Sequence, residues 1–480
     1  MTRRTPSRTA ADPDRAPLAE LDAPEPLNGH DLMRHRWFAR LMRSRAYPLV
    51  LQVPVAAVFG LVGYQLLAGP RTAHENAGTA LMWVLWWPLV PVLFVLFGRL
   101  WCAVCPFGLI SDVVQKLVGV NRPVPRFLKQ YGIWVIDVQF LAITWADHVW
   151  GIVENPWGSG VLLLLLTTAV IVSGAFFQRR TFCRYLCFLG GLCANYSRTG
   201  GVALRADTDV CATCTARAAC YNGAVVDGRE VPGCPMFTFP RTMDSSANCN
   251  LCATCIKACP NDAISIRVRP PSRELWFVRN PKVEESFLAM AIMGIVLVQN
   301  VTMLSIWGDV TSWFESSFGI TDGPLVFTIA FAVAVTLPVL ALLLAARVAA
   351  AGNLESTMKN FARFGYALIP LDVAGHLAHN LFHLLAEGRS VWFTTASLVG
   401  APAADHASTA LVGPDTIQVL QFALVGLGAA ASLYAAWRLT ARRYRSAARR
   451  RATFAPFAVL IVVATVGNLA LFTLPMAMRM

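Results

Sequence analysis

The stretch Cys249–Pro260, CNLCATCIKACP, decides how the rest of the chain is interpreted. It reads C-x2-C-x2-C-x3-C-P, the spacing with which bacterial ferredoxins hold cubane iron–sulfur clusters. Three thiolates two residues apart surround one cluster, and the Cys before Pro usually reaches a second cluster. Paired cysteines also bind zinc, but the continuation NDAISI favours iron and sulfur over a zinc ribbon. The motif therefore predicts a protein that handles electrons.

A looser cysteine motif precedes this stretch and brings the number of candidate ligands to eight. Its gaps before Cys220 and before Cys234-Pro235 depart from the standard spacing, so a zinc or three-iron site stays open for the first cluster. If the ligands cross between the motifs as they do in ferredoxins, two sets result. Cluster 1 takes Cys211, Cys214, Cys220 and Cys259, and cluster 2 takes Cys249, Cys252, Cys255 and Cys234.

The composition predicts a membrane protein. Of the 480 residues 56% are hydrophobic and only 14% are charged, which is too apolar for a soluble protein. Apolar runs of about 20 residues give about nine transmembrane helices. We expect them near residues 47–69, 79–98, 131–153, 158–178, 284–306, 324–346, 364–386, 416–437 and 453–476.

The basic residues predict the orientation of these helices. With the N-terminus inside, all Lys and Arg except Arg71, Arg389 and Arg479 fall in cytoplasmic segments or at their edges, which is 38 of 41. This is the positive-inside rule, and it predicts an N-in, C-out protein of the cytoplasmic membrane. The seven Arg in the loop 438–451 indicate contact with anionic lipid, so the net charge of +13 does not indicate nucleic acid. All thirteen Cys then lie on the cytoplasmic side, where thiols stay reduced.

The first four spans form two similar hairpins. Each returns to the cytoplasm at a Cys pair, Cys102 with Cys105 in CAVCP and Cys183 with Cys187 in CRYLC. The four thiols could meet as a site for a third iron–sulfur cluster or for a soft metal such as Cu(I); buried apolar cysteines are the alternative. Cys193 has no partner in this scheme, and we interpret it as structural.

With these motifs the chain resembles the membrane-bound polyferredoxins, the group that includes NapH, NosR and CcoG. The resemblance covers roughly residues 80–265 and rests on the two Cys pairs followed by the two-cluster motif. The first pair has two intervening residues where the family commonly has three, and Phe188 replaces the Pro expected after the second pair. The resemblance implies electron transfer between the quinone pool, or another membrane donor, and a redox partner.

The seventh span carries four ionisable side chains on one stripe, which is costly inside a membrane and indicates function. They are Asp372, His376, His379 and His383. A quinone site needs a His to bond the carbonyl group and a carboxylate to move protons, which His376, His379 and Asp372 would supply. A haem b site needs a second axial ligand. The haem ligands would then be His383 or a neighbour on the stripe, paired with His148 or Met303.

The sequence thus predicts a polytopic α-helical membrane protein with an inserted α+β ferredoxin domain carrying two [4Fe–4S] clusters. Its function would be electron transfer between these clusters and a quinone or haem, with a soluble or membrane redox protein as partner; whether it is itself an oxidoreductase stays open. Two alternatives are a copper-handling assembly factor for a respiratory enzyme and a redox sensor. The expected domains are a disordered basic tail at 1–45, the duplicated hairpins at 46–187, the ferredoxin domain at 188–283 and a five-helix unit at 284–480.

Overall fold

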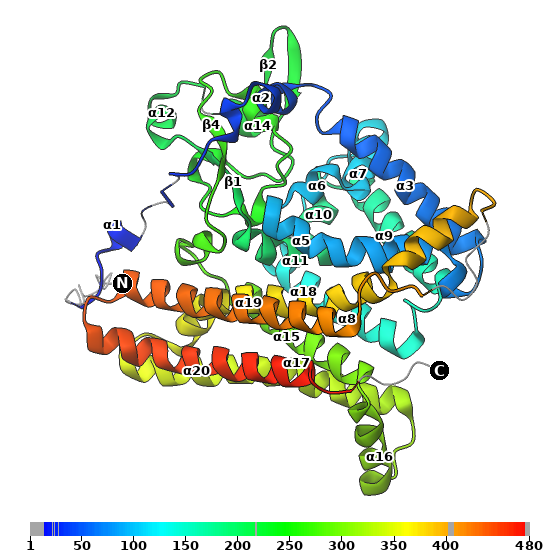
Figure 1. The fold of residues 1–480 in the computed structure, drawn as a ribbon. Coiled ribbons are helices and arrows are strands. Elements are labelled where there is room, and N and C mark those ends of the chain that lie inside the picture. Colours follow the sequence, from blue (N-terminus) through cyan, green and yellow to red (C-terminus); the bar gives the residue numbers. More distant parts are fainter. Residues whose placement is uncertain are drawn as a thin grey trace, which may run out of the picture.

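The computed structural model describes residues 14–475, apart from Asp22, Pro24, Leu27, Arg217 and residues 402–407. Expectations for residues 1–13 and for Arg479 therefore lie outside the described residues. Within them the chain is mostly helical (Figure 1), and seven helices are long and apolar enough to cross a membrane. The seven are α3 (Leu49–Ala68), α4 to α5 (Ala77–Phe97), α9 (Pro156–Phe176), α15 (Val283–Met303), α17 (Gly323–Asn353), α19 (Pro414–Arg443) and α20 (Ala447–Leu471).

Two further spans predicted from the sequence form long helices but are not among these seven. The predicted span 131–153 corresponds to α8 (Arg126–Trp150), and 364–386 lies inside α18 (Thr357–Ser397). At 1.5 Å per residue the 41 residues of α18 extend about 60 Å, twice the hydrocarbon thickness of a bilayer. The count of nine spans and their orientation remain predictions.

The two predicted hairpins have the same local plan at their cysteine ends. In the first, α5 (Trp87–Phe97) is followed by α6 (Leu100–Val104) and α7 (Pro106–Val118). In the second, α9 is followed by α10 (Thr181–Tyr185) and α11 (Phe188–Tyr196). Preceding α5 are η2 (Ala73–Glu75), α4 (Ala77–Thr79) and the π-helical turn η3 (Ala80–Trp86).

The C-terminal unit surrounds α18. Helices α15 and α19 pack along α18, and α17 and α20 form a further layer, below α15 and α19 in Figure 1. Apolar side chains from these helices and from α11 make one continuous core, and α18 is buried on all sides over much of its first half. The short helix α16 (Ile306–Phe318) projects away from this unit.

The segment between the hairpins and the C-terminal unit contains two small antiparallel sheets. Strand β1 (Val202–Ala206) pairs with β4 (Ile264–Val268), and β2 (Gly223–Val226) pairs with β3 (Arg229–Pro232). Between them lie short helices, so the segment is α+β as expected for a ferredoxin domain. These helices are α12 (Thr208–Thr213), α13 (Ala219–Asn222), η5 (Pro240–Thr242), η6 (Ser246–Asn248) and α14 (Thr254–Ala258).

The edges of this segment differ from the predicted boundary at residue 188. Helix α11 and the following turn η4 (Ser197–Thr199) are buried against α5, α15 and α18. Likewise η7 (Arg273–Trp276) packs on α19 after β4 has ended. The α+β segment proper therefore runs from β1 to β4, because the apolar faces of α11 and η7 pack against the helices of the membrane unit.

The described part of the expected N-terminal tail makes specific contacts. It contains α1 (Leu18–Leu21), η1 (Leu32–Arg34) and α2 (Arg36–Arg43). Near its start, Ala16 N–H donates to the Arg443 carbonyl at 2.9 Å, beside the turn between α19 and α20. Near its end, the Tyr47 hydroxyl donates to the Leu251 carbonyl at 2.8 Å, inside the main cysteine motif. From residue 14 onwards the segment thus links the C-terminal unit to the ferredoxin segment.

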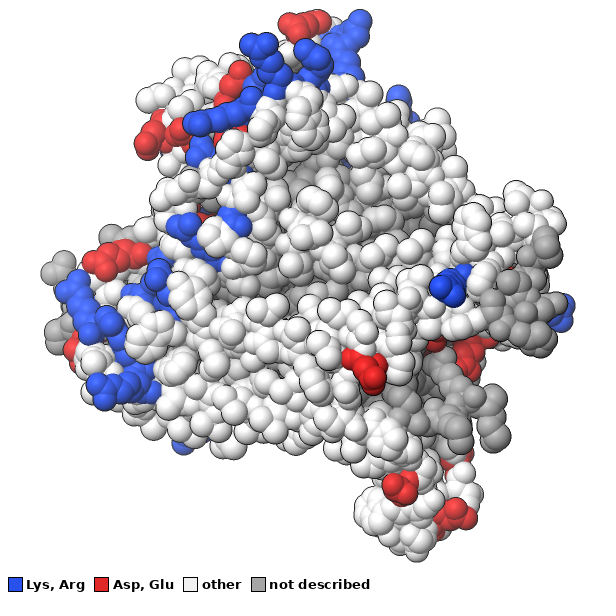
Figure 2. All heavy atoms as spheres, in the orientation of Figure 1, with Lys and Arg blue, Asp and Glu red and all other residues white. Residues whose placement is uncertain are grey.

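Charged residues are distributed unevenly over the surface. Lys and Arg gather over α2 and over the ends of α19 and α20 that meet at residues 443–447, whereas the region around α16 shows Asp and Glu (Figure 2). The positive-inside rule bases the predicted orientation on this distribution.

Candidate functional site

The structure brings together the four thiols predicted for cluster 1. Cys220 has Cys259, Cys211 and Cys214 as electrostatic neighbours. All four line one cavity of about 400 Å³, a volume that includes space open to solvent. Four thiols around one cavity, supplied by α12, α13 and the end of α14, fit the four ligands of a [4Fe–4S] cluster.

The thiols predicted for cluster 2 also lie together. Cys255, which is buried, has Cys249, Cys252 and Cys234 as electrostatic neighbours. The same thiol also interacts with Cys220 of the first set. The two sets are therefore adjacent, which suits electron exchange between two clusters.

The membrane-edge pairs meet as well. Cys187 interacts with Cys183, Cys105 and Cys102. Cys105 is the N-cap of α7 and Cys187 is the N-cap of α11, so the second Cys of each pair occupies the same place in its hairpin. The two hairpins thus present their thiols to one location.

Two arginines lie beside these four thiols. Arg99 is 3% exposed and faces Cys102 and Cys187. Arg180 is also 3% exposed, interacts with Cys183 and donates from Nε to Asp112 at 2.8 Å. Two buried guanidinium groups offset the negative charge that four thiolates or an iron–sulfur cluster would bring, so the site fits an anionic group.

Arg180 also connects the thiol sets. Its electrostatic neighbours include both Cys183 and Cys252 of the second set. A Cβ atom on Gly108 would lie 1.8 Å from Nη1 of Arg180, so any larger residue would require the guanidinium to move. The three sets of thiols therefore lie in series from the ferredoxin segment to the membrane edge.

No three His, Cys, Asp or Glu side chains among the described residues converge closely enough to hold a single metal ion. Thiolates on one tetrahedral ion bind at about 2.3 Å and so lie close to one another. Thiolates of a cubane cluster bind different iron atoms and stand further apart.

The histidine stripe of α18 is largely buried. Asp372, His376 and His379 are 2%, 4% and 7% exposed, and His383 is half-buried. Neither carboxyl oxygen of Asp372 has a hydrogen-bond partner within 3.5 Å, although Tyr196 lies close to this group. Nδ1 of His376 lies 2.9 Å from the Tyr196 hydroxyl, and the His376 ring lies 6.0 Å from that of Trp87.

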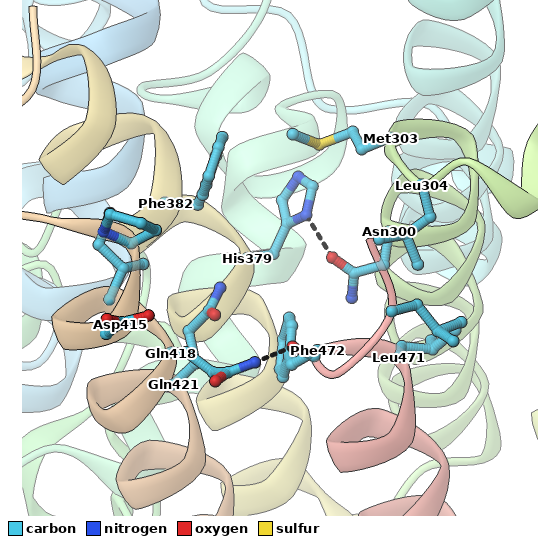
Figure 3. Close-up of a pocket in the computed structure, with 13 residues that line it drawn as sticks. Asn300, Met303, Leu304, His379, Phe382, Asp415, Gln418, Gln421, Leu471 and Phe472 are labelled. Carbon is cyan, nitrogen blue, oxygen red and sulfur yellow. Dashed lines mark hydrogen bonds between the residues drawn. The ribbon is translucent and has the colours of Figure 1, made fainter. Parts of the chain in front are cut away.

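His379 lies beside a cavity at the end of the C-terminal unit (Figure 3). Its Nδ1 is 2.7 Å from Oδ1 of Asn300 on α15, so with this amide orientation Nδ1 donates and Nε2 is left for a ligand. Nδ2 of Asn300 is buried without a hydrogen-bond partner. The cavity measures about 730 Å³, including space open to solvent. Its lining residues are Asn300, Met303, Leu304, His379, Phe382, Pro414, Asp415, Ile417, Gln418, Gln421, Leu471, Phe472 and Leu474.

Of the remaining candidates, His383 and His148 lie near His379 and Met303 lines the cavity. His383 packs its ring 5.4 Å from that of His379, and its Nδ1 is 3.4 Å from a Glu387 oxygen. His148 on α8 stacks on Phe327 at 4.8 Å and interacts electrostatically with His379. Met303 lines the cavity directly, with its side chain near His379 in Figure 3.

Some site residues could not be recognised from the sequence. Tyr196 and Asn300 are ordinary residues within apolar helices, and only the packing of α11 and α15 on α18 brings them to the histidines. Cys193, interpreted above as structural, has its Sγ 3.7 Å from Sγ of Cys102. Arg180, which faces Cys183, carries no motif either.

These features define the class of protein. It is a mostly helical, membrane-type iron–sulfur protein, and the family model described as a 4Fe-4S binding domain matches it twice, over residues 79–125 and 159–205. Each match covers one of the two membrane-edge Cys pairs, in agreement with the duplicated hairpin. No curated protein was found to be similar to this chain, and no solved structure was.

Proposed function

We propose that this chain is a membrane-bound electron-transfer protein that passes electrons between [4Fe–4S] clusters on its cytoplasmic side and a quinone bound beside His379. Cys211, Cys214, Cys220 and Cys259 would hold one cluster, and Cys234, Cys249, Cys252 and Cys255 the other. When bound, the clusters supply one-electron chemistry. The membrane-edge thiols would hold a third cluster between these two and the bilayer.

The cavity beside His379 is the observation that carries the quinone assignment. It joins an apolar wall, from Leu304, Phe382 and Leu471, to a few polar groups, as small-molecule sites do. The unpartnered Nδ2 of Asn300 offers a donor to a quinone carbonyl group. A buried donor without a partner is costly, and a ligand carbonyl would relieve that cost.

His379 supplies the acid–base chemistry that quinones require. Quinone reduction consumes a proton for each electron, and quinol oxidation releases one. With Nδ1 donating to Asn300, Nε2 of His379 accepts a proton from a quinol hydroxyl, and the imidazolium that results returns it to a quinone oxygen. Asp415 on the wall of the cavity gives the proton a next acceptor.

Contacts connect this cavity to the thiols. One turn before His379, His376 bonds to Tyr196 and packs near Trp87. Trp87 contacts Trp86 at 6.0 Å between ring centres, and Trp86 contacts Trp101 at 5.5 Å, next to Cys102 in the chain. This series of side-chain contacts gives an electron a favourable route between the cavity and the membrane-edge thiols.

Haem is a second candidate for the same cavity. Met303 and His379 both line it, and the hydrogen bond from Nδ1 to Asn300 is the kind of outer contact that orients a metal-binding histidine. His148 and His383 both lie close to His379 and are further candidate ligands for the haem. A haem would add a strong visible absorbance that a quinone lacks.

We further propose that the protein spans the cytoplasmic membrane with its N-terminus inside. The cavity lies where α15 and α20 end and α19 begins, opposite the turn between α19 and α20. In this orientation the quinone site faces the outer leaflet. The arginines of that turn would contact anionic lipid, and the ferredoxin segment would meet its redox partner in the cytoplasm.

The test uses the purified full-length protein in detergent. Iron and sulfide should amount to about eight each per chain for two cubanes, and about twelve if the membrane-edge site is loaded. A quinol analogue should reduce the clusters, and His379→Leu should abolish this reduction while dithionite still reduces them. Zinc in place of iron, or quinol reduction that survives in His379→Leu, would overturn the proposal. Loss of a visible haem band in His379→Leu would instead favour the haem.

A further inference from the structure

The membrane-edge site contains five thiols rather than four. Sγ of Cys193 lies 3.7 Å from Sγ of Cys102, and the Cys193 side chain is 1% exposed. Cys193 is on α11, six residues after its N-cap Cys187, while Cys102 is on α6 in the other hairpin. The contact therefore crosses from one hairpin to the other inside the site.

A buried charge provides independent evidence that an anionic group binds here. Arg99 has Cys102, Cys193 and Cys187 as its charged neighbours. No ion pair joins it to a carboxylate within the part of the chain that the structure describes, and its Nε has no hydrogen-bond partner. A guanidinium buried without a carboxylate requires negative charge nearby, and the three thiols are the groups it faces.

The spacing of the two pairs supplies a reason for a fifth thiol. Cys183 and Cys187 have three intervening residues, whereas Cys102 and Cys105 have two. Because Cys105 and Cys187 occupy equivalent N-cap positions, the missing residue displaces Cys102 relative to its counterpart Cys183. Cys193 is in contact with Cys102, the thiol of the pair with the shorter spacing.

We propose that Cys193 belongs to this site and alternates with Cys102 as the ligand of one iron atom of a cluster held by Cys105, Cys183 and Cys187. The inference rests on the part of the proposed function that places a cluster at the membrane edge. In the exchange, the bond from iron to the Cys102 sulfur breaks and a bond to the Cys193 sulfur forms. The thiol proton of Cys193 passes to the released Cys102 sulfur, and no electron is gained or lost.

The exchange gives the site a ligand that can leave without loss of the cluster. Only a short movement separates the two sulfur atoms, and either position lies beside Arg99. The thiol that is not bound stays buried in contact with the bound one, so it remains available. Cys105 and Cys187, as helix N-caps, have fixed backbone positions and no such substitute.

The experiment compares Cys102→Ala, Cys193→Ala and the double variant with Cys105→Ala in full-length protein. We expect each of the first two to retain about twelve iron atoms per chain, and the double variant and Cys105→Ala to fall to about eight, because one cubane holds four. The eight iron atoms of the ferredoxin segment and their EPR signal show in every variant that the chain has folded. The EPR signal of the membrane-edge cluster should differ between Cys102→Ala and Cys193→Ala.

Three results would overturn the inference. A fall to about eight iron atoms in Cys102→Ala alone would mean that Cys193 does not replace it. Retention of about twelve in the double variant would mean that neither thiol is a ligand. About eight iron atoms in the unmodified protein would mean that no cluster binds at the membrane edge. Quinol reduction of the two remaining clusters would still support the proposed function in that case.

Discussion

The Tyr196 hydroxyl lies 2.9 Å from Nδ1 of His376, and this hydrogen bond joins residues 180 positions apart. Tyr196 ends α11, the helix that begins at Cys187 and contains Cys193, and His376 is one turn from His379. The bond therefore connects the helix of the membrane-edge thiols to the helix of the proposed quinone site.

Replacing Tyr196 with Phe should slow the reduction of the clusters by a quinol analogue. The ring and its packing remain, but His376 loses the partner that orients it. One neutral hydrogen bond is worth about 1 kcal/mol, so we expect a decrease of roughly three- to tenfold in kcat with KM unchanged, measured by stopped-flow absorbance. Tyr366→Phe is the control, because this buried tyrosine is on α18, the helix of His376, but bonds to Glu285 instead. Equal rates of cluster reduction in Tyr196→Phe and Tyr366→Phe would show that the bond between Tyr196 and His376 does not contribute to electron transfer.

Replacing Asn300 with Leu should weaken quinone binding. The substitution keeps the approximate size of the side chain but removes both the unpartnered Nδ2 donor and the acceptor that orients His379. Loss of these bonds should raise the Kd of a quinone analogue about tenfold, measured by equilibrium binding. Thr302→Val on the same helix serves as control, because Thr302 does not line the cavity and its hydroxyl bonds to Gln299. An unchanged Kd for Asn300→Leu would place the quinone elsewhere.

Replacing Glu274 with Gln should destabilise the junction between the ferredoxin segment and the helices. The Glu274 carboxylate is fully buried and accepts bonds from Arg205 at 2.9 Å, from Arg269 at 2.5 Å and from Ser245 at 2.6 Å. Removing one partner of a buried ion pair costs about 3–5 kcal/mol. The melting temperature in detergent should fall accordingly, and Glu315→Gln on the exposed surface of α16 should leave it unchanged.

The Glu274 carboxyl group should also make the stability of the protein depend on pH. Burial acts to raise the pKa of Glu274, but Arg269 and Arg205 outweigh it and lower the pKa to about 2, from 4.5 in the unfolded chain. Stability from this group is complete above pH 4.5 and is lost as the pH falls towards 2. The difference in melting temperature between the protein and Glu274→Gln should therefore shrink over this range. A difference that stays constant would show that the carboxylate charge does not contribute.

Topology reporters test the orientation. A reporter inserted after Arg445, in the turn between α19 and α20, should behave as cytoplasmic. One inserted after Thr409, between α18 and α19, should behave as external. The reverse pattern would mean that the orientation is opposite to the predicted one and that the ferredoxin segment lies outside. The same result at both positions would mean that α19 does not cross the membrane.

The grouping of the cysteine side chains was predictable because its information is local. Fixed spacing within Cys249–Pro260, together with the crossing rule, predicts groupings that the structure brings together. The stripe on α18 was likewise visible from helical periodicity. Contacts between helices could not be predicted from the sequence. An apolar helix can pack against many other apolar helices, and only the assembled unit determines which pairs meet. Tyr196 and Asn300 carry no motif, and the part played by residues 14–47 depends on backbone bonds that composition does not reveal.

The pairing of β1 with β4 has a consequence for how the protein is put together. Val202 lies opposite Val268, so the chain leaves the helical body and returns to it at one point. The whole α+β segment is then an insertion with adjacent ends, and Met42 and Tyr47 from the segment before α3 complete its core. A replacement for this segment would therefore have to match both the spacing of its two ends and the surface that Met42 and Tyr47 cover.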